Sequence, residues 1–242
     1  MTPSLTADTA LFLDIDGTLL DLARTPESVV VPAALRHALE RLCRDLDGAL
    51  AFVSGRTLES IDSLFAPFRP AAIGTHGAEI RGADGRVERA PPLPDSVRAL
   101  FRSLAAKSPG LLLEDKESAL ALHYRLAPEV APFLLATLER EAPFLAAQKA
   151  QVIHGKAVID VRHAGTDKGS AVLRLARQTP FRGRKLLFGG DDTTDADVFR
   201  ILPQIGGRGF SVGRDFPGAE HLFENPRAVR DWLIGLAEVG VA

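Results

Sequence analysis

The stretch ALFLDIDGT, residues 10–18, decides the fold, because a short apolar run ends in two acidic residues and a glycine. Four consecutive apolar residues are typical of a parallel strand that is covered on both faces. Asp14 and Asp16 are two residues apart, so on an extended backbone their side chains point the same way. Gly17 permits a sharp turn after them. This stretch therefore predicts a central strand that ends with two carboxylates in one site.

Apolar runs of the same kind recur along the chain, at residues 49–53, 71–74 and 185–188. Helical patterns lie between the runs, and three of them start at residues suited to a helix N-terminus: Pro32, Thr57 and Asn225. Alternation of strand and helix is typical of α/β proteins with a doubly wound parallel sheet. We therefore predict a Rossmann-like core to which both ends of the chain contribute.

The middle of the chain has a different pattern, since residues 118–125 and 156–162 alternate between polar and apolar. Such alternation is typical of a sheet that is covered on one face only. Leu120 and Leu122 would share the covered face, whereas His123 would lie on the open one.

Two helical patterns, residues 95–107 and 128–141, are available to cover the apolar face of this second sheet. We therefore expect a smaller α+β cap domain, residues 92–164, inserted into a catalytic core of residues 1–91 and 165–242.

The composition of the 242 residues favours small-molecule chemistry. The formal charge at pH 7 is −2 with both signs scattered along the chain, so no basic field exists that would hold nucleic acid or an anionic membrane. The single cysteine, Cys43, cannot form an internal disulfide. The first ten residues lack a targeting pattern, and no apolar run approaches the roughly 18 residues of a membrane helix. We expect a soluble cytoplasmic protein, a monomer, that acts on a small molecule.

Three further motifs lie where predicted strands end or predicted helices begin. Ser54-Gly55-Arg56 follows an apolar run and precedes a helix, so a hydroxyl and unpaired backbone N–H groups are available to an anion. Lys168, within the stretch TDKG of residues 166–169, opens a helix at the end where a cation is unfavourable, so an anion nearby would explain it. The stretch GGDDTTD, residues 189–195, places three carboxylates close together, and a hard divalent cation would relieve their repulsion.

Each motif alone has an ordinary explanation. An acidic pair also caps helices or binds metal in glycosyl-transferring enzymes, a lysine is usually solvated, and acidic stretches also form polar loops. Their joint placement at strand ends, where open parallel sheets bind ligands, indicates one functional site.

In their order along the chain, DIDGT, SGR, TDKG and GGDDTTD resemble the four motifs of haloacid-dehalogenase-like (HAD) phosphatases. The match spans nearly the whole chain, and an insertion between the second and third motifs resembles members with a large sugar-phosphate cap. Four further segments sharpen the likeness to trehalose-6-phosphate phosphatases: GTHGAE at residues 74–79, EDK at 114–116, HYR at 123–125, and GK at 155–156 running into Val161-Arg162. That family usually carries glutamate and proline where this chain has Asp160 and His163, and the shorter Asp160 would alter contacts to sugar hydroxyls.

The resemblance implies a Mg²⁺-dependent phosphatase that converts trehalose 6-phosphate to trehalose and phosphate in trehalose biosynthesis. It implies that Asp14 is the nucleophile of an aspartyl-phosphate intermediate, that Asp16 is the general acid and base, and that Lys168 compensates charge. The metal ligands would be Asp14, Asp191 and the backbone carbonyl of Asp16. The remaining core residues would bind phosphate or support the ligands: Ser54, Gly55, Asp192 and Asp195.

The cap would bind the sugar through charged side chains, since one Trp and one Tyr leave little scope for aromatic stacking. The residues expected to contact substrate are Arg56, Glu114, Lys116, Arg125, Lys156 and Asp160. We expect structural roles for His76, His123 and His154.

Three other functions are compatible with parts of this pattern. The first is another HAD sugar-phosphate phosphatase or a phosphomutase, acting on sucrose, mannosyl or hexose phosphates. The second is an inactive regulator that binds a sugar phosphate, although such a binder needs no paired nucleophile and acid. The third is a structural or interaction module, which leaves the clustered motifs unexplained.

Overall fold

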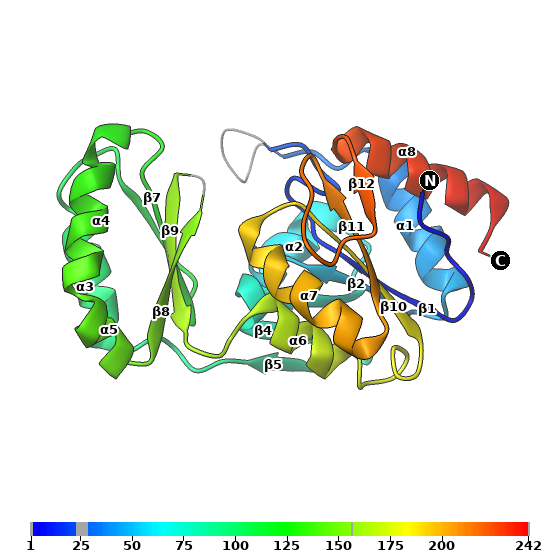
Figure 1. Cartoon of the computed structure of the whole chain (residues 1–242), viewed down its shortest axis with the longest axis horizontal. Coiled ribbons are helices and arrows are strands. Elements are labelled where there is room, and N and C mark those ends of the chain that lie inside the picture. Colours follow the sequence, from blue (N-terminus) through cyan, green and yellow to red (C-terminus); the bar gives the residue numbers. More distant parts are fainter. Residues whose placement is uncertain (1, 23–28, 156, 242) are drawn as a thin grey trace. The chain divides into compact units, whose positions relative to one another are not determined.

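The structure is a computed structural model that describes residues 2–22, 29–155 and 157–241. The chain forms two compact units, one of residues 1–88 and 167–242 and the other of residues 89–166 (Figure 1). No helix among the described residues is both long and apolar enough to cross a membrane.

The larger unit is built on an eight-stranded sheet in the order β12-β11-β10-β1-β2-β3-β4-β5. The strands are β1 (Thr9–Leu13), β2 (Leu50–Val53), β3 (Ala71–Gly74), β4 (Glu79–Arg81), β5 (Val87–Arg89), β10 (Lys185–Gly190), β11 (Arg208–Val212) and β12 (His221–Phe223). The strands from β12 to β3 pair in parallel, and β4 is antiparallel to β3. The predicted apolar runs are confirmed as the four central strands, whereas β4, β5, β11 and β12 were not predicted.

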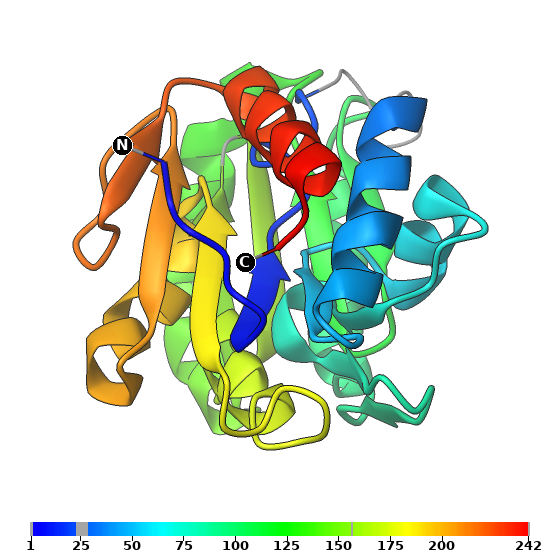
Figure 2. The same cartoon turned by 90° about the vertical axis from the view of Figure 1, so that its right-hand side faces the viewer.

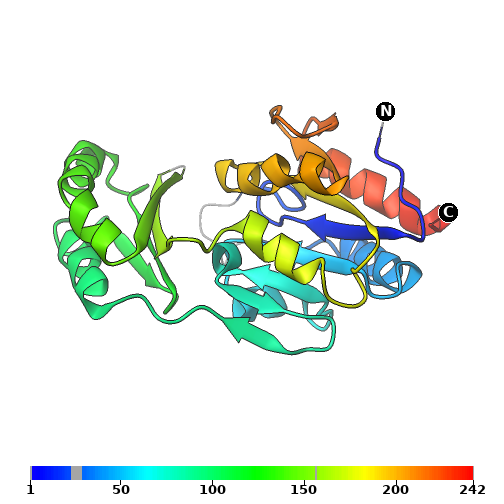
Figure 3. The same ribbon diagram turned by 60° about the horizontal axis from the view of Figure 1, so that its bottom comes forward.

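Helices cover both faces of this sheet. Two of them, α1 (Ala33–Asp45) and α8 (Pro226–Val239), lie side by side on one face (Figure 2). On the other face α6 (Lys168–Leu175) lies beside α7 (Ala196–Ile201) (Figure 3). The remaining helix of this unit, α2 (Leu58–Phe65), contacts β3.

The predicted helix starts are confirmed. The Thr57 hydroxyl accepts a hydrogen bond from the Ser60 amide, and the Asn225 side chain accepts one from the Ala228 amide. Pro32 occupies the residue before α1. Each side-chain cap satisfies a backbone donor that the first helical turn leaves unpaired.

The smaller unit contains an antiparallel sheet in the order β6-β7-β9-β8. Its strands are β6 (Leu112–Asp115), β7 (Ala119–His123), β8 (Ala150–Gly155) and β9 (Val158–His163), and its α-helices are α3 (Asp95–Ala105), α4 (Ala131–Arg140) and α5 (Ala142–Ala147). The three helices lie on one face of the sheet (Figure 1). The predicted alternation is confirmed, because Leu120, Leu122, Ile159 and Val161 join the hydrophobic core of this unit. Strand β8 was not predicted.

The core of the larger unit is rich in phenylalanine, and Phe52 is fully buried within it. Its ring stacks on Phe65 with a centroid distance of 4.3 Å and meets Phe68 edge-on at 6.0 Å. The β2 segment is thereby fixed directly before the Ser54 motif.

We expect Phe52→Ala to lower the free energy of unfolding by about 3–5 kcal/mol, because removing the ring leaves a cavity that the packed neighbours cannot fill. Leu222→Ala serves as the control, since the Leu222 side chain is largely exposed, and it should change stability by no more than about 0.5 kcal/mol. Chemical denaturation of both variants measures the difference, and equal effects would contradict this account of the core.

Candidate active site

Three of the four motifs converge because their strands are neighbours. Asp14 follows β1, Ser54 follows β2, and the acidic loop that begins at Asp191 follows β10. β1 pairs in parallel with both β2 and β10, so all three segments leave the same edge of the sheet. This edge is where open parallel sheets bind their ligands.

The Lys168 side chain joins the first motif to the fourth. Its ammonium group donates hydrogen bonds to Asp14 Oδ1 at 2.8 Å and to Asp195 Oδ1 at 2.6 Å. Only 2% of the residue is exposed. Burial alone would lower the pKa of Lys168, but the two adjacent carboxylates outweigh burial and raise that pKa above its ordinary value. Lys168 is therefore a permanent cation within the site, and the sequence expectation of an anion beside it is correct.

The two carboxylate oxygens of Asp14 differ, because only Oδ1 accepts a hydrogen bond from Lys168. Its Oδ2 is buried and has no hydrogen-bond partner among the described residues. Burial raises the pKa of Asp14 well above its usual range; Lys168 opposes this shift, while Asp195 and Asp191 add to it. A buried oxygen of this kind calls for a further positive partner.

Asp14, Asp191 and Asp195 form a cluster in which one oxygen from each lies within 4.8 Å of the others. Both oxygens of Asp195 are already engaged. Oδ1 accepts from Lys168, and Oδ2 accepts from the amides of Asp191 at 2.9 Å and Asp192 at 3.0 Å. Asp195 therefore holds the loop and the lysine, and leaves Asp14 and Asp191 to face an ion.

The Asp191 carboxylate lies unusually close to the backbone of the first motif. Gly17 has a φ of +91°, and a Cβ at this position would overlap the carboxylate of Asp191. Oδ1 of Asp191 accepts a hydrogen bond of 3.2 Å from the Thr18 hydroxyl. Burial raises the pKa of Asp191 to about 7, with the charge of Asp195 as the next cause. An all-oxygen set with raised carboxylate pKa values and an unpartnered buried oxygen fits a hard divalent cation such as Mg²⁺.

Asp16 points its carboxylate at Arg56. The guanidinium Nε donates to Asp16 Oδ2 at 2.6 Å, and Nη2 donates to Oδ1 at 2.7 Å. The sequence predicted a site role for both residues but assigned Arg56 to the substrate, and no sequence feature predicted this contact.

The second motif is braced by a turn that the sequence analysis treated only as part of a resemblance. The Thr75 amide donates to the Arg56 carbonyl at 2.7 Å, and the His76 amide donates to the Ser54 carbonyl at 3.0 Å. Thr75 and His76 have φ values of +48° and +53°, which are rare for residues with a Cβ. A Cβ at Gly55 would overlap the His76 ring, so glycine is needed there for this close packing.

Two other predicted core residues take supporting positions. The buried Ser54 hydroxyl accepts a hydrogen bond of 3.1 Å from the Arg56 amide. Asp192 caps the short helical turn Thr193–Asp195 through a reciprocal capping box with Asp195.

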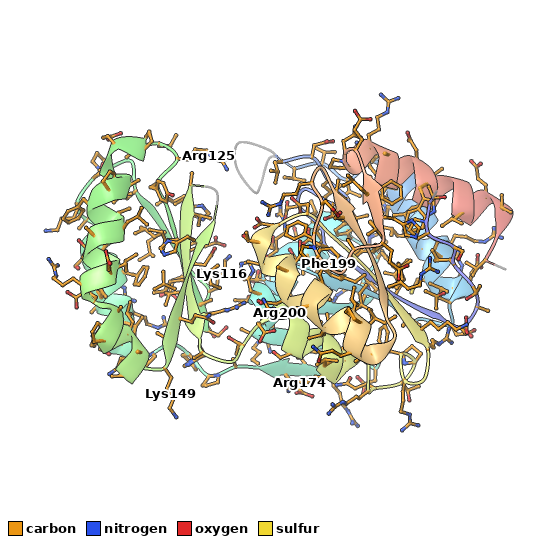
Figure 4. All side chains as sticks on the ribbon, viewed as in Figure 1. Lys116, Arg125, Lys149, Arg174, Phe199 and Arg200 are labelled. Atoms are coloured by element: carbon orange, nitrogen blue, oxygen red, sulfur yellow. The ribbon has the colours of Figure 1, made fainter. Side chains whose placement is uncertain are left out.

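In the smaller unit, charged side chains gather on the sheet face opposite the helices. The strand register aligns Glu114, Ala121 and Asp160 across β6, β7 and β9, so their side chains share a face. Oε2 of Glu114 lies 3.4 Å from both Lys116 Nζ and His123 Nε2. Lys116 and Arg125 can be followed in Figure 4.

Both acidic residues of this face are shifted in pKa. Burial raises the pKa of Asp160, against the pull of Lys116 and His123, whereas the hydrogen bond with His123 lowers the pKa of Glu114. His123, expected to be structural, belongs to the charged group. Arg125 is exposed in the turn after β7, and Lys156 lies outside the described residues.

Comparison with known proteins identifies the family. Residues 12–220 match the trehalose-phosphatase family. The chain belongs to this family. It is 44% identical over 240 residues to a probable trehalose-phosphate phosphatase of Sinorhizobium fredii, covering 96% of this chain and 89% of the relative. It is 36% identical over 239 residues to the trehalose-6-phosphate phosphatase of Escherichia coli, and the match covers 96% of this chain and 88% of that relative.

Solved structures share the fold. A trehalose-6-phosphate phosphatase related protein matches with a TM-score of 0.77 at 26% identity, covering 95% of this chain and 97% of its own. The C-terminal domain of the C. albicans trehalose-6-phosphate phosphatase matches with a TM-score of 0.82 at 22% identity, covering 99% of both chains. A haloacid dehalogenase-like hydrolase of B. subtilis matches with a TM-score of 0.67 at 15% identity, and the match covers 95% of this chain and 99% of that one. The predicted family and the doubly wound α/β class are confirmed.

The raised pKa of Asp191 predicts how Mg²⁺ should stabilise this trehalose-phosphatase family member. Protons compete with a metal ion for Asp191 below about pH 7, so added Mg²⁺ should raise the unfolding temperature more at about pH 8 than at about pH 6. The metal-free protein itself should become less stable as the pH rises. Its folded state binds more protons than its unfolded state between pH 3.8 and about 7, so its stability falls as pH rises through that window.

Thermal unfolding with Mg²⁺ and with a chelator measures both trends. Asp191→Asn is the control variant and should lose most of the stabilisation by Mg²⁺. Equal stabilisation of this variant and the natural protein would show that Asp191 does not bind the added ion.

Proposed function

We propose that this protein is a Mg²⁺-dependent phosphatase that hydrolyses trehalose 6-phosphate to trehalose and phosphate in trehalose biosynthesis. Membership of the trehalose-phosphatase family and the high identity to its relatives support this proposal and make the chain a phosphoric monoester hydrolase. The observation that carries it is the contact of buried Lys168 with Asp14, whose second oxygen has no hydrogen-bond partner among the described residues. A carboxylate held in this way is suited to attack a phosphate.

In the first half of the reaction Asp14 attacks phosphorus. An aspartyl-phosphate forms as the bond between phosphorus and the sugar oxygen breaks, and Asp16 donates its proton to that oxygen, so trehalose leaves as a neutral alcohol. Lys168 keeps Asp14 oriented and offsets part of the negative charge.

In the second half a water molecule attacks the phosphorus of the aspartyl-phosphate. Asp16 accepts the proton of that water, the bond from phosphorus to Asp14 breaks, and phosphate leaves with both carboxyl groups restored. Ser54 and the Gly55 backbone are proposed to bind phosphate oxygens. Asp192 and Asp195 are proposed to hold the acidic loop in place, which the contacts of Asp195 with Lys168 and two amides support.

Asp14 and Asp191, with the backbone carbonyl of Asp16, are the residues proposed to hold Mg²⁺. When bound, the ion supplies positive charge against the meeting of an anionic nucleophile with an anionic phosphate.

The charged sheet face of residues 89–166 is proposed as the sugar-binding surface of a cap. Glu114, Lys116 and Asp160 offer carboxylate and ammonium groups around the small side chain of Ala121, an arrangement suited to sugar hydroxyls. Arg125 and Lys156 are proposed as further contacts. We also propose that the enzyme works as a monomer in the cytoplasm; light scattering and cell fractionation test these two points.

We expect Asp14→Asn to abolish phosphate release from trehalose 6-phosphate while the protein stays folded, because the amide is nearly isosteric but is not an anionic nucleophile. The assay compares a panel of sugar phosphates with and without Mg²⁺. The natural protein should prefer trehalose 6-phosphate and lose activity with a chelator. Turnover near the natural rate by Asp14→Asn would refute the nucleophile assignment, and a preference for another sugar phosphate would refute the substrate.

We expect Glu114→Ala, Lys116→Ala and Asp160→Ala each to reduce kcat/KM for trehalose 6-phosphate by about tenfold to more than a hundredfold. This range corresponds to a lost hydrogen bond to a charged group, about 1.5–3 kcal/mol. Hydrolysis of 4-nitrophenyl phosphate should be largely spared, because that substrate has no sugar to bind.

Glu139→Ala, on the exposed surface of α4, is the control within the same unit. If the three variants impair both substrates equally, these residues shape the catalytic site and not the sugar site. If they impair neither substrate, the sugar binds elsewhere.

A further inference from the structure

The Asp16 carboxylate must point in a defined direction to pass protons, yet its position gives it little steric support. It lies beyond the end of β1, before the turn at Gly17, and 29% of its side chain is exposed. A short side chain in such a place has several rotamers available. The proposed roles of Asp16 in both halves of the reaction require one of them.

Arg56 supplies the missing restraint. Two of its donors meet the two Asp16 oxygens at 2.6 and 2.7 Å, so the plane of the carboxylate is fixed by a paired contact. The Arg56 side chain is itself only 9% exposed. By contrast, the arginine of a typical surface ion pair of this protein, Arg41–Asp45, is 52% exposed. A forked contact from a nearly buried guanidinium restrains its partner in a way that a solvated pair does not.

The backbone of Arg56 is held as firmly as its side chain. Its amide donates to the Ser54 hydroxyl, and its carbonyl accepts from Thr75 at 2.7 Å. Thr75 is β-branched and sits at a positive φ, a conformation that survives only where the surroundings enforce it. Glu79 provides that enforcement, because its Oε2 accepts from the Thr75 hydroxyl at 3.0 Å and from the Leu58 amide at 2.9 Å.

The fork leaves room for the proton that Asp16 must carry. Each carboxylate oxygen has two lone pairs, and the arginine fork uses one on each oxygen. A proton can therefore bind a remaining lone pair of Asp16 without displacing the Arg56 contact.

We propose that Arg56 is a positioning residue that acts through Asp16, and not a residue whose main task is to bind the sugar. This inference rests on the proposed function, specifically on proton donation by Asp16 to the leaving oxygen. The donors that face Asp16 are occupied by it, and the strained turn at Thr75 and His76 directs the whole Ser54-Gly55-Arg56 segment toward that contact.

The test uses sugar-free substrates whose leaving groups differ in how much they need a proton. kcat/KM is measured on a series of aryl phosphates from 4-nitrophenyl to phenyl phosphate, and it reports the steps up to departure of the phenol. Arg56→Gln and the charge-conserving Arg56→Lys should each lower kcat/KM for phenyl phosphate at least about tenfold more than for 4-nitrophenyl phosphate, because a misaligned acid fails first on poor leaving groups. Asp16→Asn should show the same pattern more strongly. Arg86→Gln, at a side chain that is 90% exposed, should leave the series unchanged.

The double variant Asp16→Asn with Arg56→Gln should resemble Asp16→Asn alone, since residues that act through one another are not additive. Additive losses would overturn the proposal. So would equal losses across the aryl series, or a loss confined to trehalose 6-phosphate, which would make Arg56 a structural or sugar-binding residue.

If Asp16→Asn itself shows no dependence on the leaving group, the acid assignment in the proposed function fails, and the role of Arg56 fails with it. Unfolding temperatures of all variants, with and without Mg²⁺, show that the comparison is made on folded protein.

Discussion

Lys168 places one ammonium group between the carboxylates of Asp14 and Asp195, in a part of the molecule that solvent scarcely reaches. Isolated charges at this depth would be strongly unfavourable, and each of the three is tolerable only because the others are present. The position of Lys168 at the first residue of α6 follows from the Asp167 cap, so a local helix signal fixes the geometry of a long-range contact. The acidic loop depends on the same contact, because Asp195 also holds the amides of Asp191 and Asp192.

Even with Lys168, the site carries more negative than positive charge. Asp14 and Asp191 both have raised pKa values, for which burial is the main cause and neighbouring carboxylates add to it. A site of this kind is unfavourable without a cation and becomes favourable with one, so the stability of the fold and the readiness for chemistry are linked through the same groups. Gly17 contributes by lacking a side chain, because any Cβ there would displace Asp191 from the first motif.

The parts of this protein that could be predicted from sequence are those set by short-range pattern. Apolar runs predicted β1, β2, β3 and β10, and capping residues predicted the starts of α2 and α8. The order of the four motifs predicted which residues meet, because parallel neighbours end at one edge. Edge strands such as β5 and β12 are three residues long and carry no distinctive period, so they were missed.

Side-chain direction could not be predicted in the same way. The residue type at position 56 predicted a cation at the site, but whether it faces a ligand or Asp16 depends on the backbone turn at Thr75 and His76. That turn uses φ values that Thr and His seldom adopt, so no propensity points to it. His123 was predicted to lie on the open face of the second sheet, but its contact with Glu114 was missed for a related reason. Its place beside Glu114 depends on the register between β6 and β7, which a single strand pattern does not specify.

The two charged groups of this protein differ in how firmly they are held, and the difference suits different tasks. Around Asp14 and Asp16 the contacts are short, from 2.6 to 2.8 Å, and involve charged groups on both sides. Such prearranged groups stabilise a changing charge distribution without reorganising during the reaction. On the sheet of the smaller unit the distances from Glu114 to Lys116 and His123 are both 3.4 Å, and the Glu114 side chain remains 44% exposed. Longer contacts to a half-exposed carboxylate exchange partners more readily, which supports the proposal that sugar hydroxyls bind at this face. The proposed roles follow this difference in distance: chemistry for the short contacts around Asp14 and Asp16, and sugar recognition for the longer ones around Glu114.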